Sequence, residues 1–167
     1  IKNFKKATSL NPQNASIYNN LGEVYNKMGN LNESIINYKK AIQLQPTFWE
    51  AYNNLSLVYE EKGDIQPAIK ICQKSIVIEP KNPHAYNNLG VLYFKLKNYN
   101  RALEKIKKAI ELKSNFTVAY NNLGNVFQEM KNYNKAIYYY KQALKYHKES
   151  SVIHNNIGIV QKLIGNY

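Results

Sequence analysis

The feature that most constrains the fold of this chain is a sequence repeat with a period of 34 residues. The tetrapeptide Tyr-Asn-Asn-Leu occurs at 18–21, 52–55, 86–89 and 120–123, and a weaker copy, His-Asn-Asn-Ile, occurs at 154–157. A fixed period of this length is typical of solenoids, in which each repeat is a small supersecondary unit that cannot bury its apolar face alone. The chain is therefore predicted to be an array of stacked repeats.

Within each repeat, the pattern of residues predicts two helices. We number the repeats from Ala15, Trp49, Pro83, Thr117 and Ser151. Position 4 is then Tyr or His, position 7 is Leu or Ile, and position 8 is Gly or Ser. Position 11 is aromatic in the four full repeats. Together these four positions form one stripe of an α-helix. In the second helix, small residues at positions 20 and 27 would let neighbouring backbones approach closely, and bulkier apolar residues lie between them.

Glycine and proline mark the expected ends of these helices. Position 15 ends the first helix with Gly29, Gly63 or Gly165, where a left-handed C-cap needs no side chain, and Lys97 and Lys131 are the two exceptions. Proline cannot continue a helix, so it stops the second helix at position 32 of the earlier repeats. These residues are Pro12, Pro46 and Pro80.

This pattern of Tyr, Leu-Gly, Tyr, Ala and Pro at fixed offsets resembles the tetratricopeptide repeat over the whole chain. The resemblance implies an all-α, right-handed superhelical solenoid of antiparallel helix pairs, with first helices on the concave surface and second helices on the convex surface. We expect one array over 1–167, cut at both ends, with four full repeats and two half repeats. Residues 1–14, which include Ala7, are expected to be the second helix of a preceding repeat. The full repeats are expected at 15–48, 49–82, 83–116 and 117–150. Residues 151–167 are expected to be the first helix of a following repeat.

Asparagine fills positions 5 and 6 of all five first helices. Because position 7 is buried, positions 2, 9 and 13 lie on the opposite side of the helix, flanked by 5 and 6, and this side is the expected groove. A row of amides could hold the peptide groups of an extended partner without reading its side chains, with Asn54, Asn88 and Asn122 as backbone clamps. The alternative is that these amides only bond between neighbouring first helices. The predicted peptide-binding residues are Asn19, Asn20, Asn53, Asn54, Asn87, Asn88, Asn121, Asn122 and Asn156, together with Phe94 at position 12 as a possible aromatic anchor.

The predicted function is a protein–protein interaction module that binds an extended peptide or a partner helix in the concave groove. The doubled Asn is most similar to the repeats of O-linked N-acetylglucosamine transferases, so an alternative is the substrate-recognition arm of such a glycosyltransferase. The Lys and Arg clamp that related domains use for chaperone C-termini is missing, because Asn19, His84 and Asn88 occupy its positions. An apolar floor at Leu57, Val91, Val118 and Val152 could take partner side chains, or could instead pack against the adjacent helix.

The formal net charge of +12 raises a third possibility, which is polyanion binding on the convex face. Most of the excess lies on the expected second helices, at Lys105, Lys107, Lys108, Lys135, Lys141 and Lys145. Nucleic-acid readers usually add Arg or aromatic stacking, and the chain has one Arg, at position 101, so nucleic acid is disfavoured. Heavy use of Asn, Lys, Ile and Tyr is also what an A/T-rich genome would produce.

Catalysis, cofactors and metals find no support in the sequence. There is no Gly-rich phosphate loop, no nucleophile motif and no repeated carboxylate pair, while one Cys and three His do not make a metal-ligand set. We therefore expect no enzymatic activity in these residues, no cofactor and no metal. No apolar run reaches the roughly 18 to 20 residues that span a bilayer, and without a signal-peptide pattern we expect an intracellular, cytoplasmic location. Self-association through the exposed array ends is left open.

Overall fold

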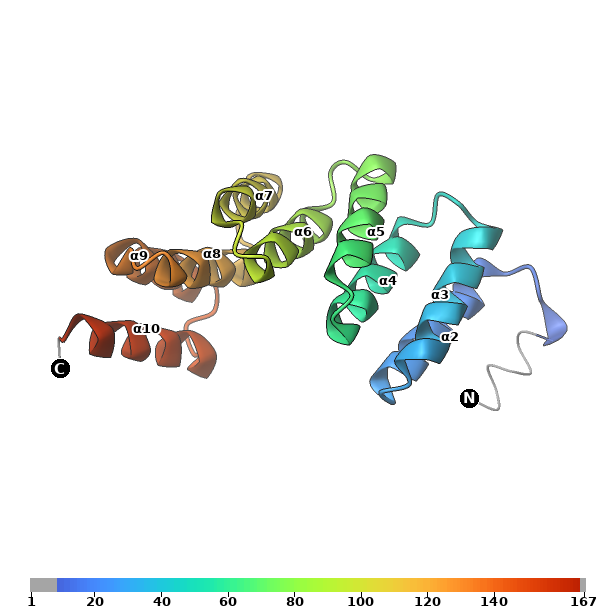
Figure 1. Ribbon diagram of the computed structural model, residues 1–167, viewed down its shortest axis with the longest axis horizontal. Coiled ribbons are helices and arrows are strands. Elements are labelled where there is room, and N and C mark those ends of the chain that lie inside the picture. Colours follow the sequence, from blue (N-terminus) through green and yellow to red (C-terminus); the bar gives the residue numbers. More distant parts are fainter. Residues whose placement is uncertain (1–8, 166–167) are drawn as a thin grey trace. The chain divides into compact units, whose positions relative to one another are not determined.

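The computed structural model describes residues 9–165, and all regular structure in this range is helical. The chain divides into two compact units, an N-terminal unit at 1–80 and a C-terminal unit at 81–167. Successive helices form antiparallel pairs within each unit, which confirms the predicted all-α fold (Figure 1). Residues 1–8 of the expected preceding helix, including Ala7, lie outside the described residues. The grouping of 1–167 into one array of four full and two half repeats stays a prediction.

The helices follow the repeat closely. In the N-terminal unit they are α2 (Ala15–Lys27), α3 (Leu31–Leu44), α4 (Trp49–Lys62) and α5 (Ile65–Ile78). In the C-terminal unit they are α6 (Pro83–Lys95), α7 (Tyr99–Leu112), α8 (Thr117–Glu129), α9 (Tyr133–Tyr146) and α10 (Ser151–Ile164). The even-numbered helices are the first helices of the repeats, and each begins at the residue from which its repeat is numbered.

The turn after each first helix places position 15 in the left-handed region. Gly29, Gly63 and Gly165 have φ values of 74°, 87° and 79°, as predicted for C-cap glycines. Lys97 and Lys131 adopt the same conformation, with φ values of 57° and 58°. In all four complete turns, the backbone N–H of position 16 donates to the carbonyl of position 11 at 2.8–2.9 Å. This shared hydrogen bond needs the left-handed residue, so the turn imposes it on lysine as well as on glycine.

We expect Lys131→Gly to stabilise the chain by about 0.5–1 kcal/mol. A residue with a Cβ pays roughly 1–2 kcal/mol in the left-handed region, and part of this gain is offset by the greater backbone entropy of glycine in the unfolded chain. Urea unfolding followed by circular dichroism measures the change. The reciprocal control is Gly63→Ala, at the same position of another repeat, which should destabilise by a similar amount. A lower midpoint for Lys131→Gly would contradict this explanation.

Small residues let the two helices of a repeat approach closely. A Cβ built on Gly124 of α8 would lie 2.3 Å from the ring of Tyr140 on α9, and a Cβ on Gly22 would lie 2.8 Å from the ring of Tyr38. Both tyrosines are almost fully buried. Where the small residue is a serine, its hydroxyl can bond across the pair, as Ser56 does to the Ala68 carbonyl at 3.0 Å. This packing leaves the opposite side of the first helices, with its paired asparagines, uncovered by the second helix.

Candidate functional site

The asparagines at positions 5 and 6 form hydrogen bonds between neighbouring first helices. In each case, Nδ2 of the position-6 residue donates to Oδ1 of the position-5 residue in the preceding repeat. We call these bonds the asparagine ladder. Its members are Asn54 to Asn19 at 3.1 Å in the N-terminal unit, and Asn122 to Asn87 at 2.9 Å and Asn156 to Asn121 at 3.0 Å in the C-terminal unit.

The ladder fixes the position-6 amides and leaves part of each amide unused. A side-chain amide carries two N–H donors and one carbonyl acceptor. The ladder bond uses one N–H, and within the described residues Oδ1 of Asn54, Asn122 and Asn156 accepts no hydrogen bond. A carbonyl and one N–H on each amide are therefore held in a defined orientation. The inter-helix bonding that the sequence left as an alternative is present, and it is compatible with binding a ligand.

The other predicted binding residues differ in accessibility. Asn19 and Asn87 are buried as ladder acceptors, and Asn19 also donates to Asn20 at 3.5 Å. Asn20 is exposed, whereas Asn53 and Asn88 are half-buried. The ring of Phe94 is half-buried against Tyr99 of α7, with centroids 6.1 Å apart. Direct contact of these residues with a partner stays a prediction.

An apolar cavity of about 400 Å³ lies beside the ladder in the C-terminal unit. Two of its lining residues, Val118 and Val152, were predicted as an apolar floor, and they are 54% and 62% exposed. We call it the valine pocket, and its lining is completed by Thr117, Asn121, Tyr146, His147, Ser150 and Ile153. Asn121 therefore belongs to both the ladder and the pocket. Leu57 and Val91, the other expected floor residues, do not line this cavity.

Part of the lining of the valine pocket could not be inferred from the repeat pattern. Tyr146, His147 and Ser150 come from the end of α9 and the loop before α10, where the motif residues give no signal. The ring of Tyr146 is stacked on that of Tyr120, with centroids 5.9 Å apart. This stacking holds Tyr146, a residue of the second helix α9, against the first helix α8.

A core tyrosine orients one residue of the expected groove. The Tyr140 hydroxyl lies 2.8 Å from Oδ1 of Asn125 at position 9, and 2.9 Å from Oε1 of Gln128. Burial, and then the Glu129 carboxylate, raise the pKa of Tyr140 to about 12, so the hydroxyl stays protonated and donates at neutral pH. Among the full repeats, only this one has Asn at position 9 together with Tyr at position 24. The sequence therefore held a sign of this hydrogen bond, but a comparison that looks only for residues shared by all repeats misses it.

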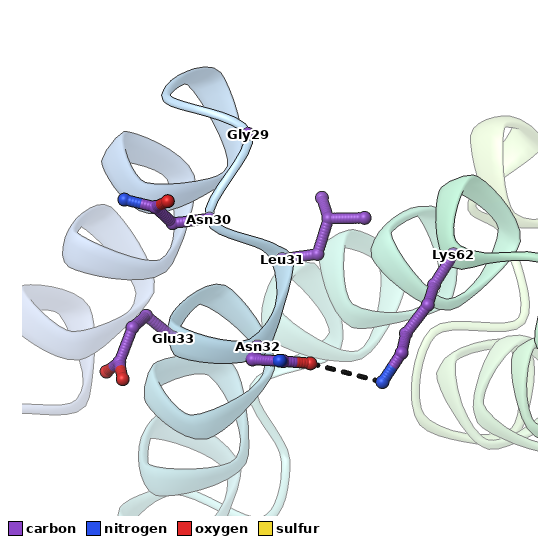
Figure 2. A pocket seen from close by; sticks show the side chains of 6 residues that line it. All are labelled: Gly29, Asn30, Leu31, Asn32, Glu33 and Lys62. Carbon is purple, nitrogen blue, oxygen red and sulfur yellow. Dashed lines mark hydrogen bonds between the residues drawn. The ribbon is translucent and has the colours of Figure 1, made fainter.

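Two further cavities are products of the repeat geometry. One, of about 510 Å³, is lined by the turn between α2 and α3 and by Lys62, whose Nζ donates to Oδ1 of Asn32 at 3.1 Å (Figure 2). The other, of about 430 Å³, is lined by residues 130–134, at the same turn of another repeat, and by Ile164. Lys62 and Ile164 occupy the same position of their repeats. Since the same hollow recurs with different side chains and contains no predicted binding residue, we do not regard it as a specific site.

Repeat-family models match most of the chain. A Tetratricopeptide repeat model matches residues 82–149, another matches 50–82, and a TPR repeat model matches 1–29 and 24–63. Together these matches extend from residue 1 to residue 149. The chain belongs to the tetratricopeptide repeat family. Tetratricopeptide repeats bind protein partners and are typically non-catalytic scaffolds, so this chain is a protein-interaction module.

Several solved structures share this fold. MamA matches with a TM-score of 0.76 and 28% identity, over 89% of this chain and 86% of MamA. YrrB, described as a TPR protein with an unusual peptide-binding site, matches with a TM-score of 0.73 and 23% identity, over 98% and 84% of the two chains. PilF of Pseudomonas aeruginosa matches with a TM-score of 0.83 and 21% identity, over 92% and 70%. A comparison with curated protein sequences finds no match.

Residues 9–165 offer neither a metal site nor a helix that could cross a membrane. None of the groups of His, Cys, Asp and Glu in this range brings together three residues able to hold a metal ion. The helices described there are too short or too polar to cross a bilayer. The cytoplasmic location stays a prediction.

Proposed function

We propose that the C-terminal unit binds an extended segment of a partner protein across α8 and α10. The amides of Asn122 and Asn156 hold the backbone of the segment, and the valine pocket takes one apolar side chain. The observation that supports this proposal most strongly is the position of Asn121, which accepts the ladder bond from Asn156 and also lines the pocket. The amide that would bind the backbone of the segment and the pocket that would bind its side chain thus lie next to each other.

The chemistry of the two parts is complementary. An amide with a free carbonyl and a free N–H matches the donor and acceptor of a peptide group, so it binds an extended backbone of any sequence. The exposed Val118 and Val152 side chains add a preference for an apolar residue at one position, because burying them removes apolar surface from water. The expected ligand is therefore an extended segment with one aliphatic or aromatic anchor.

The similarity to known proteins supports the class of ligand. YrrB, with which the chain shares its fold, is described as having a peptide-binding site. The doubled asparagine remains the basis of the second hypothesis, in which the same surface selects substrates for an attached glycosyltransferase of the O-linked N-acetylglucosamine class. Both hypotheses use the same groove chemistry, and they differ in whether the bound segment is afterwards modified.

Acidic substitutions in the valine pocket test the proposal. We expect Val118→Asp and Val152→Asp each to weaken binding of an uncharged peptide, selected from a random library, by about tenfold or more, because a carboxylate in the pocket must be desolvated. Both residues lie in the first turn of their helices, where no acidic residue is present and a carboxylate favours the helix, so folding should be preserved. The control for added charge outside the pocket is Val77→Asp in the last turn of α5, where the valine is 79% exposed. Equal affinity for all three variants would refute the proposed pocket.

A further inference from the structure

The two units of the chain differ strongly in charge. Residues 81–167 hold fourteen Lys and Arg and four Glu, a net charge of +10, whereas residues 1–80 hold nine basic and seven acidic residues, a net charge of +2. In the C-terminal unit, the second helices α7 and α9 carry seven of these cations and only two carboxylates, those of Glu104 and Glu111. The basic charge is therefore concentrated on the helices that do not carry the asparagine ladder.

The two carboxylates on these helices are already engaged. Lys105 lies 2.8 Å from Glu104, and Lys108 lies 2.9 Å from Glu111. Two more cations lie over aromatic rings, Arg101 over Tyr93 at 5.5 Å and Lys135 over Phe127 at 5.4 Å. The three that remain form no ion pair with any carboxylate in the described part of the chain. They are Lys107, Lys141 and Lys145, and all three are exposed.

One of these lysines, Lys107, lines an aromatic cavity whose only carboxylate, that of Glu111, is the one paired with Lys108. The cavity is about 350 Å³ in volume and lies between α7 and α9, with Tyr120 and Leu123 of α8 also in its lining. Lys107 lines it directly, and so does Tyr138, which is 54% exposed. On α9, Tyr138, Lys141, Gln142 and Lys145 are spaced three, four and seven residues apart and therefore share one face of the helix.

We propose that this α7–α9 surface is a second interaction site, which binds an acidic protein segment. Carboxylates of the segment pair with Lys107, Lys141 and Lys145, and an apolar side chain between them enters the cavity against Tyr138. The site goes beyond the proposed peptide groove, since none of its residues belongs to the ladder or the valine pocket. A tetratricopeptide repeat unit of this kind could hold two segments at once.

The aromatic geometry favours an acidic protein segment over nucleic acid. Single-stranded nucleic acids need ring faces on which successive bases can stack. Here the ring of Tyr139 is stacked on Phe127 at 5.2 Å, and Tyr140 is fully buried in the core. Of these three consecutive tyrosines, only Tyr138 is exposed, and its ring meets that of Tyr139 edge to face at 5.1 Å. Tyr146, which is 48% exposed, is stacked on Tyr120 and does not line the cavity. The one accessible ring in the cavity is therefore that of Tyr138, and it suits one apolar anchor flanked by carboxylates.

Charge reversal with a matched control tests the proposal. The probe is a fluorescein-labelled peptide of alternating Glu and Ser with one central Leu, and affinity is measured by fluorescence anisotropy. We expect Lys107→Glu/Lys141→Glu to weaken binding at least about tenfold, because like charges would then face each other. The control Lys70→Glu/Lys74→Glu on α5 changes the net charge equally on two exposed residues of the N-terminal unit, and it should have little effect. Equal losses in both variants would contradict the site, since only nonspecific attraction would then be operating.

The cavity and the class of partner are tested with the same probe. Tyr138→Ser in the protein, or Leu→Ser in the peptide, should weaken binding about fivefold. Ile36→Ser on α3, where the isoleucine is 58% exposed, should not weaken binding. A single-stranded RNA of equal charge should bind more weakly than the peptide and should not respond to Tyr138→Ser. Tighter binding of the RNA, or no measurable binding of the acidic peptide to the unmodified chain, would overturn the proposal.

Discussion

Replacing Gly124 by alanine is expected to destabilise the chain by about 2–3 kcal/mol, whereas the same change at Gly158 should stabilise it by about 0.5–1 kcal/mol. Both glycines are at position 8 of their repeats. The added Cβ at Gly124 would lie 2.3 Å from the buried Tyr140 ring, which cannot move without displacing the packed interior of α8 and α9. At Gly158, within the described residues, nothing beyond the adjoining residues and the surrounding turns of α10 lies within 4 Å of the new Cβ. There, only the better helix propensity of alanine acts.

Chemical unfolding distinguishes the two effects. Urea titrations followed by circular dichroism give the change in unfolding free energy for each variant. Opposite signs for the two glycines would show that helix-pair contact, and not the helix propensity of glycine, determines position 8. Equal shifts at both sites would contradict the packing described for Tyr140.

Replacing Asn122 and Asn156 together by alanine is expected to weaken peptide binding by about tenfold or more. Each substitution removes a preorganised carbonyl and N–H from the surface, and each hydrogen bond to a ligand contributes about 0.5–1.5 kcal/mol. A loss of 1.4 kcal/mol corresponds to a factor of ten in affinity. The variant should also be less stable, because Oδ1 of the buried Asn87 loses its donor.

Two controls separate binding from stability in this experiment. Asn100→Ala/Asn134→Ala removes two exposed asparagines from α7 and α9 and should leave affinity unchanged. Asn87→Ala removes only the acceptor that orients Asn122, so it should give a smaller, few-fold loss. The fraction of folded protein is checked by circular dichroism at the assay temperature. Full affinity in a folded double variant would exclude the ladder as a ligand clamp.

The fold was predictable because one signal is repeated with the same spacing through the chain. A single Tyr-Asn-Asn-Leu motif would be weak, but its recurrence fixes both the helix type and the stacking, and the observed helices begin where the repeats are numbered. The left-handed conformation of Lys131 was not evident from the residue type. It follows from the backbone hydrogen bond that the turn requires, for which residue preference is only a weak guide.

The candidate site was less predictable, because an asparagine amide has the same chemistry toward a partner and toward a neighbouring helix. Only the three-dimensional spacing shows that Asn122 bonds to Asn87 and keeps a carbonyl for another group. The wall of the valine pocket includes Tyr146 and Ser150, which belong to no motif position. Likewise, the charge excess was visible in the sequence, but which lysines lack a carboxylate partner depends on side-chain geometry.

A crystal structure of the chain bound to a selected uncharged peptide would test the peptide-binding proposal most directly. We predict an extended peptide across α8 and α10, with backbone N–H and carbonyl groups within about 3.2 Å of the Asn122 and Asn156 amides and an apolar side chain between Val118 and Val152. A peptide bound elsewhere, with no backbone contact to these amides, would contradict it.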